Sequence, residues 1–172
     1  MKKGYIQVYT GNGKGKTTAA FGLALRAAGV GMKVFIAQFV KGQEYSETVA
    51  VRGFLPSVTI KQYGLDCFIV NIPTQADIDI ARKGLEEVSV VISSGEYDMV
   101  ILDEANIAVF YNLFTPSALI DVLKRKPEAL EIIITGRYAC PEILEIADLV
   151  TEMKEVKHYY AQGVMARKGI EC

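Results

Sequence analysis

The sequence predicts an α/β fold in which a mainly parallel sheet is covered by helices on both faces. Short apolar runs rich in β-branched residues alternate with longer segments in which apolar residues recur every three or four positions. This alternation is typical of strand–helix–strand units with right-handed crossovers. Apolar residues make up 51% of the 172 positions, enough for the core of a single domain spanning residues 1–172.

Six runs have the composition of strands and are bounded by glycine, proline or polar turn residues. In chain order, these predicted strands are residues 5–9, 33–39, 58–63, 99–104, 131–135 and 149–153. The second, fourth and fifth of them are almost continuously apolar. We therefore expect these three to be buried on both faces at the centre of the sheet.

Five segments between the strands predict helices by their starting signals or their apolar periodicity. In chain order, the first begins at Ala19, the second covers 45–53 and the third runs from Thr74 to Gly95. The fourth begins at Thr115–Pro116, and the fifth covers 141–147. The first should be capped by Gly29 and Gly31. The longest has a capping-box start at Thr74 and Asp77, followed by one apolar stripe.

The glycine-rich turn Thr10–Thr18, after the first strand, predicts a phosphate-binding loop. Glycines let successive N–H groups point into one concavity, and the following helix adds the positive end of its dipole. Lys16 supplies a cation for phosphate oxygens, and the Thr17 hydroxyl lies where it can bind Mg²⁺. The strict pattern has glycine at the first position of this run, which is threonine here; Gly11 and Gly13 supply the freedom instead. The alternative is a flexible turn that binds nothing.

Polar residues follow the carboxyl ends of four predicted strands, and parallel pairing brings these ends to one edge of the sheet. They are Lys16–Thr17, Gln38–Lys41, Asp103–Glu104 and Thr135–Arg137. The two acids form a Walker-B-like ending, where a carboxylate can hold Mg²⁺ directly or through water. Two buried acids repel each other, so a metal or a basic partner is expected. The residues alone leave open which acid faces the metal and which caps the next helix.

Several other side chains have both a functional and a structural interpretation. Arg26 could lean back along its helix toward the phosphates, or it could be a surface arginine. Lys41 and Arg137 could pair with phosphate or with the acids. The apolar loop 64–73 either packs over the core or covers a large ligand. The single histidine, His158, is expected to have a structural role.

Charge and cysteine content exclude several classes of protein. The formal net charge is −1, and the dense cluster Lys124–Lys126 is expected in the last turn of a helix, where it caps carbonyls rather than binding nucleic acid. Cys67, Cys140 and Cys172 form no CxxC pair, which excludes a zinc site of that type and a disulfide framework. No apolar run approaches the roughly 20 residues of a membrane span, and no signal peptide is present, so we expect a cytoplasmic protein without a membrane partner.

Five motifs, in order along nearly the whole chain, are similar to those of the P-loop ATP:corrinoid adenosyltransferases. They are Thr10–Gly22, Gln38–Gly42, Leu102–Glu104, Ile134–Arg137, and Val156–His158 with a closing Gly-Ile-Glu. The resemblance implies a P-loop NTPase-like (RecA-like) three-layer fold. It implies an enzyme that transfers the 5′-deoxyadenosyl group of ATP to the Co(I) of cob(I)alamin or cob(I)yrinic acid a,c-diamide. Inorganic triphosphate is released, in adenosylcobalamin biosynthesis or salvage.

The resemblance also implies roles for particular residues, with the phosphates of ATP running in the reverse sense through the loop. Lys16 and Glu104 are expected to act in catalysis, and Thr17 with Glu104 to hold Mg²⁺ (or Mn²⁺). Together with the loop chemistry, it assigns nucleotide binding to Gly11, Asn12, Gly13, Lys14, Gly15, Lys16, Thr17, Thr18, Arg26 and Lys41. A corrinoid substrate, a reductase that supplies Co(I) and a homodimer are implied as well.

One feature departs from the family pattern. The chain has no tryptophan, and it has Gly64–Phe68 where the family often places a Phe and a Trp that close on the corrin. Tyr63, Leu65 or Phe68 could provide this apolar cover instead. Two other functions remain open at this point, a P-loop kinase or ATPase with another substrate and a non-enzymatic nucleotide switch.

Overall fold

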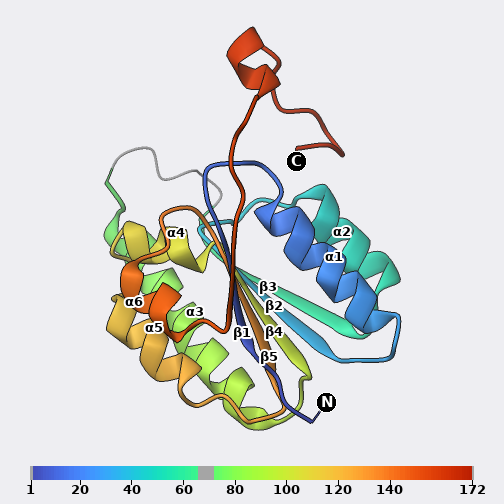
Figure 1. Cartoon of the computed structure of the whole chain (residues 1–172), viewed down its shortest axis with the longest axis vertical. Coiled ribbons are helices and arrows are strands. Elements are labelled where there is room, and N and C mark those ends of the chain that lie inside the picture. The colour runs from blue at the N-terminus through green and yellow to red at the C-terminus, as the bar shows by residue number, and fades with distance from the viewer. Residues whose placement is uncertain (1, 66–71, 172) are drawn as a thin grey trace.

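The computed structural model describes residues 2–65 and 72–171, which form one sheet with helices on both sides (Figure 1). The strands are β1 (Ile6–Thr10), β2 (Val34–Phe39), β3 (Val58–Tyr63), β4 (Met99–Asp103), β5 (Glu131–Thr135) and β6 (Leu149–Glu152). The helices are α1 (Lys16–Ala28), α2 (Ser46–Phe54), α3 (Gln75–Ser94), α4 (Ala105–Phe110), α5 (Pro116–Leu123) and α6 (Pro141–Ile146), followed by the short 3₁₀ helix η1 (Tyr159–Gln162). Each of the six predicted strands is confirmed to within one residue at either end.

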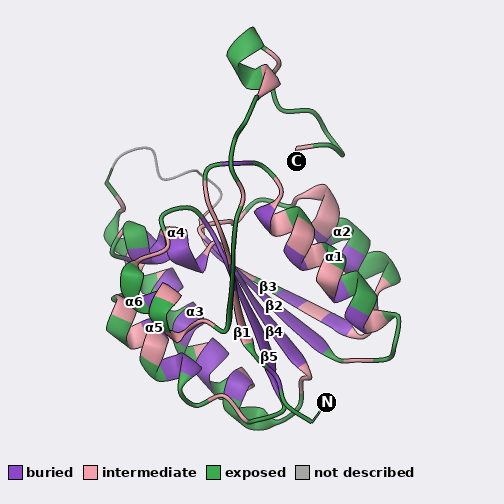
Figure 2. Ribbon diagram, in the orientation of Figure 1, coloured by how far each residue is buried: buried purple, intermediate pink, exposed green. Residues whose placement is uncertain are grey.

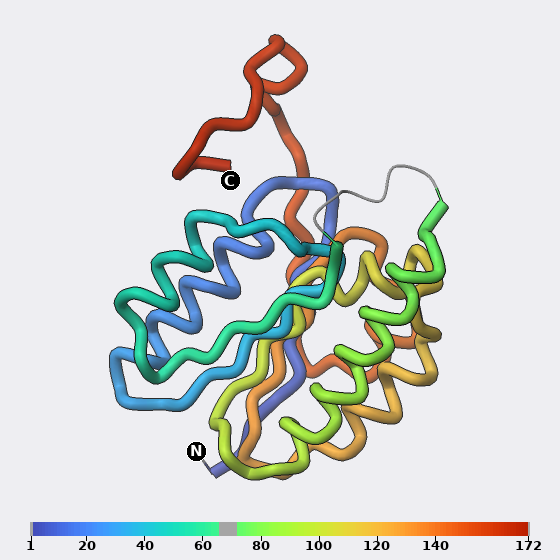
Figure 3. The backbone as a smooth tube through the Cα atoms, turned by 180° about the vertical axis from the view of Figure 1, so that it is seen from behind, coloured from blue at the N-terminus to red at the C-terminus, as the bar shows by residue number. Residues whose placement is uncertain are grey.

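The sheet has the strand order β3-β2-β4-β5-β1-β6, and every neighbouring pair is parallel. Helices α1 and α2 cover one face, and α3, α4, α5 and α6 cover the other, as the two opposite views show (Figures 1 and 3). The predicted three-layer α/β fold is therefore confirmed. Because all strands run the same way, the turns after β1, β2, β4 and β5 meet at one edge.

The core lies in two layers, one on each face of the sheet. Every residue of β2, β4 and β5 is buried, as their continuous apolar runs predict (Figure 2). On one side Ala20 and Ala24 of α1 pack against the sheet, while Leu85 and Val88 of α3 pack on the other side. The small alanines let α1 lie close to the strands, which places its N-terminus directly at the end of β1.

Most helix signals are confirmed, one local prediction is wrong, and one helix was missed. The Thr74–Asp77 capping box and Pro116 at the start of α5 are both present. Gly29 is the C-cap of α1, as expected, with a right-handed φ of −62°, and the nearby Gly31 takes a left-handed φ of 79°. The cluster Lys124–Lys126 begins only at the C-cap of α5 rather than in its last turn. Helix α4 was not expected, because it follows β4 through Glu104 alone with no linker.

In the described part of the chain, no helix is both long and apolar enough to cross a bilayer.

Two of the basic residues after α5 bind neighbouring segments of the chain. Arg125 Nη1 donates to Ser89 Oγ at 2.9 Å, and Lys126 Nζ donates to the Gly4 carbonyl at 2.7 Å. These contacts join the end of α5 to α3 and to the chain before β1.

Replacing Gly84 by alanine is expected to destabilise the fold by about 2 kcal/mol through overpacking. Gly84 is the contact of α3 with β3, and a Cβ there would lie 2.4 Å from Cγ of the Tyr63 ring. Gly22→Ala in α1 is the matched control, because a Cβ at Gly22 would meet nothing within 4 Å. That control should stabilise the protein by about 0.5–1 kcal/mol. Urea denaturation measures both, and equal effects would contradict the tight α3–β3 contact.

Candidate active site

The turn between β1 and α1 has the backbone of a phosphate-binding loop. Gly11 and Gly15 adopt φ values of 96° and 117°, a region that favours glycine. A Cβ on Gly11 would lie 2.4 Å from the Met153 carbonyl oxygen, and the N–H of Gly13 donates to that same oxygen at 2.7 Å. The chain leaving β6 therefore supports the loop from one side, and only glycine fits against it.

Lys16 begins α1 and is folded into the loop. Its ammonium donates to the carbonyl oxygens of Gly11 and Gly13, both at 2.7 Å, and the residue is 7% exposed. Burial lowers the pKa of Lys16, and the charge of nearby Glu104 opposes this effect. Phosphate oxygens would be stronger acceptors than these two carbonyls, because a hydrogen bond between two charged groups is stronger than one to a neutral group.

Asp103, the last residue of β4, is fully buried and is the centre of the polar cluster at this edge. Its carboxylate accepts hydrogen bonds from Thr17 Oγ1 (2.9 Å), Thr135 Oγ1 (2.7 Å), Gln38 Nε2 (3.1 Å) and Lys41 Nζ (2.9 Å). Burial alone would raise the pKa of Asp103, but the Lys41 charge and these hydrogen bonds outweigh it and lower that pKa. The carboxylate is therefore ionised, and its acceptor sites are already used.

Glu104 is in a different situation, although it is the next residue. Its backbone is left-handed (φ 58°, ψ 20°), and its N–H donates to Thr135 Oγ1 at 3.0 Å. Within residues 2–65 and 72–171, no group donates a hydrogen bond to its carboxylate. Burial and the charge of Asp103 raise the pKa of Glu104, against the opposing charges of Lys41, Lys16 and Arg137. A carboxylate held this way is poised to bind a cation.

The residues at this edge fit a Mg²⁺ ion that is bound together with nucleotide phosphates. No group of three or more His, Cys, Asp or Glu side chains in the described ranges could hold a metal by itself. Mg²⁺ does not need one, since it is usually bound by one or two protein oxygens, several waters and the phosphates. The open carboxylate of Glu104 and the Thr17 hydroxyl would supply those protein oxygens. Metal binding by these two residues stays a prediction.

The structure brings only part of the predicted nucleotide-binding set together. Lys41 reaches Asp103, and Arg137 follows β5 close enough for its charge to act on Glu104. Arg26 is exposed in the last turn of α1, ten residues after Lys16 and thus about 15 Å along the helix. Its contact with the nucleotide stays a prediction. Asn12, Lys14 and Thr18 lie exposed around the loop.

Of the three residues predicted as a cover for the corrin, Phe68 lies outside the described residues and Leu65 is half-buried, so a role of either one stays a prediction. Tyr63 is 6% exposed and packs in the core under α3, so it is not a cover for the site. Sequence reasoning missed an exposed aromatic pair at this edge. Phe110 and Tyr138 stack with ring centroids 4.3 Å apart, and Tyr138 follows Arg137 directly. Their adjacency depends on tertiary packing, and no sequence signal announces it.

Residues 2–172 match the sequence profile of the family described as ATP:corrinoid adenosyltransferase BtuR/CobO/CobP. The chain belongs to this family.

Curated corrinoid adenosyltransferases resemble the chain over almost its full length. The protein of that name from Pseudomonas aeruginosa is 34% identical over 171 residues, which cover 99% of this chain and 84% of the relative. The Escherichia coli K12 protein is 36% identical over 171 residues, with 99% and 86% covered. Corrinoid adenosyltransferase CobA of Salmonella typhimurium is 36% identical over 173 residues, again with 99% and 86% covered. The resemblance to this family, inferred above from the sequence motifs, is therefore confirmed.

Asp103→Asn is expected to destabilise the protein by about 3 kcal/mol, because it removes the carboxylate that forms the buried ion pair with the Lys41 ammonium. The Lys41 side chain is 15% exposed and that of Asp103 is fully buried. Glu44→Gln is the control, since its ion pair with Arg52 is exposed on both sides and should be worth about 1 kcal/mol or less. Chemical denaturation measures both. A similar small cost for the two variants would contradict the central role of the Asp103 carboxylate.

Glu104→Gln is expected to stabilise the nucleotide-free protein. A gain of about 1 kcal/mol in the free energy of unfolding would raise its Tm by about 2–4 °C. The raised pKa of Glu104 means that the folded protein disfavours the ionised form of this carboxylate, and glutamine removes that unfavourable charge. The penalty is fully present above the raised pKa of Glu104 and disappears below the pKa of the unfolded chain, so the gain in Tm should narrow as the pH falls through this range. Glu96→Gln, at an exposed position, should change Tm little at any pH. An unchanged or lower Tm for Glu104→Gln at pH 8 would contradict this account.

Proposed function

We propose that this protein transfers the 5′-deoxyadenosyl group of ATP to the Co(I) of a corrinoid, cob(I)alamin or cob(I)yrinic acid a,c-diamide, and releases inorganic triphosphate. The observation that carries this proposal is the family match over residues 2–172. The geometry at the end of β1 supports it, since a glycine loop, Lys16 and two acids are assembled at one edge.

The arrangement of the site suits a reaction in which the substrate itself provides the nucleophile. Co(I) attacks the 5′ carbon of ATP, so the protein does not have to activate a hydroxyl or a water molecule. Its work is to position two substrates and to stabilise the charge that develops on the departing triphosphate. The polar groups described around Asp103 include a lysine ammonium and hydroxyl groups, and the histidine, His158, lies in the C-terminal segment instead.

Lys16 and the loop amides would carry most of the charge stabilisation. In this structure Lys16 donates to two loop carbonyls, so one of its three N–H donors remains for a phosphate oxygen, and ATP can take over the other two. Thr17 and Glu104 would hold Mg²⁺ (or Mn²⁺), which supplies further positive charge next to the triphosphate. Asp103 holds Thr17 and Lys41 in place rather than contacting the substrate.

Further parts of the proposal concern the surroundings of the enzyme. A reductase would have to supply the Co(I) state, because nothing in the described site can donate electrons to cobalt. A homodimer and a cytoplasmic location are proposed from the family resemblance and from the composition of the chain.

The products of the reaction test the proposal. Incubation with Mg·ATP and chemically reduced cobalamin should yield inorganic triphosphate and adenosylated cobalamin in equal amounts, the latter measured by the absorbance of its new Co–carbon bond. Lys16→Ala should lower this rate at least about 100-fold, since it removes a charged donor to the leaving group. Lys124→Ala, at a position whose side chain is 71% exposed after α5, should keep the full rate. ADP and phosphate as the products, or an unimpaired Lys16→Ala variant, would contradict the proposal.

A further inference from the structure

The C-terminal segment, residues 154–171, leaves the sheet after β6 and extends beyond the α/β body (Figure 1). It then turns back, so that its end lies near the start of α1 and the phosphate-binding loop. The segment includes the closing Gly-Ile-Glu motif at 169–171, to which the proposed reaction gives no role. It also includes η1, whose start is capped by His158: the Nδ1 atom accepts from the Tyr160 N–H at 3.0 Å.

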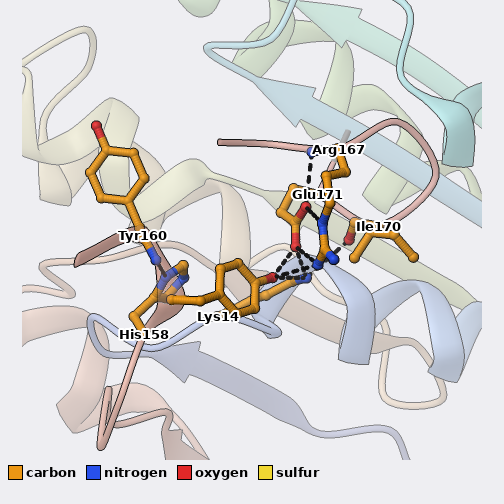
Figure 4. A network of polar contacts seen from close by, with 7 residues as sticks. Lys14, His158, Tyr160, Arg167, Ile170 and Glu171 are labelled. Carbon is orange, nitrogen blue, oxygen red and sulfur yellow. Dashed lines mark hydrogen bonds and ion pairs between the residues drawn. The ribbon is translucent and has the colours of Figure 1, made fainter. Parts of the chain in front are cut away.

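Lys14 of the phosphate-binding loop is held by this segment (Figure 4). Its ammonium donates to Glu171 Oε1 at 2.9 Å, to the Ile170 carbonyl at 3.0 Å and to the Tyr159 hydroxyl at 3.4 Å. An ammonium has three donors, and here all three point to acceptors in the C-terminal segment. Lys14 therefore cannot donate to a phosphate without leaving at least one of these partners.

Glu171 is the acceptor around which the cluster is built. Besides Lys14, it accepts from the Tyr159 hydroxyl and from three groups of Arg167, the main-chain N–H (2.9 Å), Nε (3.2 Å) and Nη2 (3.1 Å). Arg167 first, and then Tyr159 and Lys14, hold the pKa of Glu171 well below its usual range. Its side chain is only 14% exposed, and it is ionised wherever the protein is folded near neutral pH.

Little apolar burial fixes the segment in place. Val156, Tyr160, Met165 and Ile170 are 95%, 66%, 69% and 57% exposed, and η1 contains no buried residue. A segment with so few buried apolar contacts opens locally at low cost. The polar contacts to Lys14 are therefore a large share of what holds its far end beside the loop.

We propose that Glu171 is a latch on the phosphate-binding loop: it occupies Lys14 in the nucleotide-free protein, and the triphosphate of ATP takes Lys14 over and releases residues 154–171. This inference rests on the proposed binding of ATP in the loop. The triphosphate carries more negative charge than one carboxylate and offers Lys14 several oxygens. A carboxylate next to the loop also repels the incoming phosphates, so the latch and the nucleotide compete.

The first test is ATP affinity. Glu171→Gln in the full chain should bind Mg·ATP about two- to fivefold more tightly by calorimetry, the range expected for removal of an exposed competing ion pair. Tyr159→Phe removes one hydroxyl that contacts both Lys14 and Glu171, so a smaller effect in the same direction is expected. Glu155→Gln is the matched control, because it removes the same charge from an exposed position of the same segment. It should leave the affinity unchanged.

The second test is the release itself. Trypsin can cut after Arg167, and the Arg167 side chain must leave Glu171 to enter the protease. Mg·ATP, or tripolyphosphate as a probe of the phosphate site alone, should accelerate this cleavage in the unmodified protein. In Glu171→Gln, cleavage should be fast without either ligand.

The outcomes separate the latch from the proposed function. Two results would overturn the latch alone, provided that the unmodified protein binds ATP. One is an ATP affinity of Glu171→Gln that is unchanged or weaker, and the other is protection of residues 154–171 from trypsin by ATP. If the unmodified chain bound no ATP at all, the proposed function would be overturned and the latch with it.

Discussion

The buried carboxylate of Asp103 is the constraint on which the site depends. A fully buried charge is tolerated only when it is paired, and here the four partners come from α1, β5, β2 and the turn after β2. Satisfying this one group therefore fixes the position of the helix that carries Lys16 and Thr17 relative to the neighbouring strands. The phosphate-binding loop has a defined shape because both of its ends are held. Its first end continues β1, and its last end leads into α1, where Thr17 is bound to Asp103.

Two adjacent acids acquire opposite properties from their surroundings. The pKa of Asp103 is lowered because Lys41 and the hydrogen bonds outweigh its burial, whereas the pKa of Glu104 is raised by burial and by the charge of Asp103. Such a divergence is a common sign that neighbouring titratable groups have different tasks. The Asp103 carboxylate accepts four hydrogen bonds, whereas no described group donates to that of Glu104, which leaves one acid structural and the other open to a cation.

The sequence was sufficient for the strands and for the edge at which the polar residues meet, because apolar runs and parallel topology determine both. It could not predict α4, whose start depends on a single left-handed residue, Glu104. It also could not choose between Asp103 and Glu104, since their difference lies in donors that are up to 86 residues away in the chain. The contact of Lys14 with Glu171 spans 157 residues, and no local pattern encodes it.

Both lysines of the loop donate hydrogen bonds within the protein itself when no nucleotide is present. Lys16 uses two loop carbonyls and Lys14 uses the C-terminal segment, including the Glu171 carboxylate. With a formal net charge of −1, the chain as a whole offers ATP no long-range attraction, and binding has to come from this local exchange of partners. The strength of ATP binding is therefore the difference between two sets of hydrogen bonds, and the weaker the internal set, the tighter the nucleotide will bind.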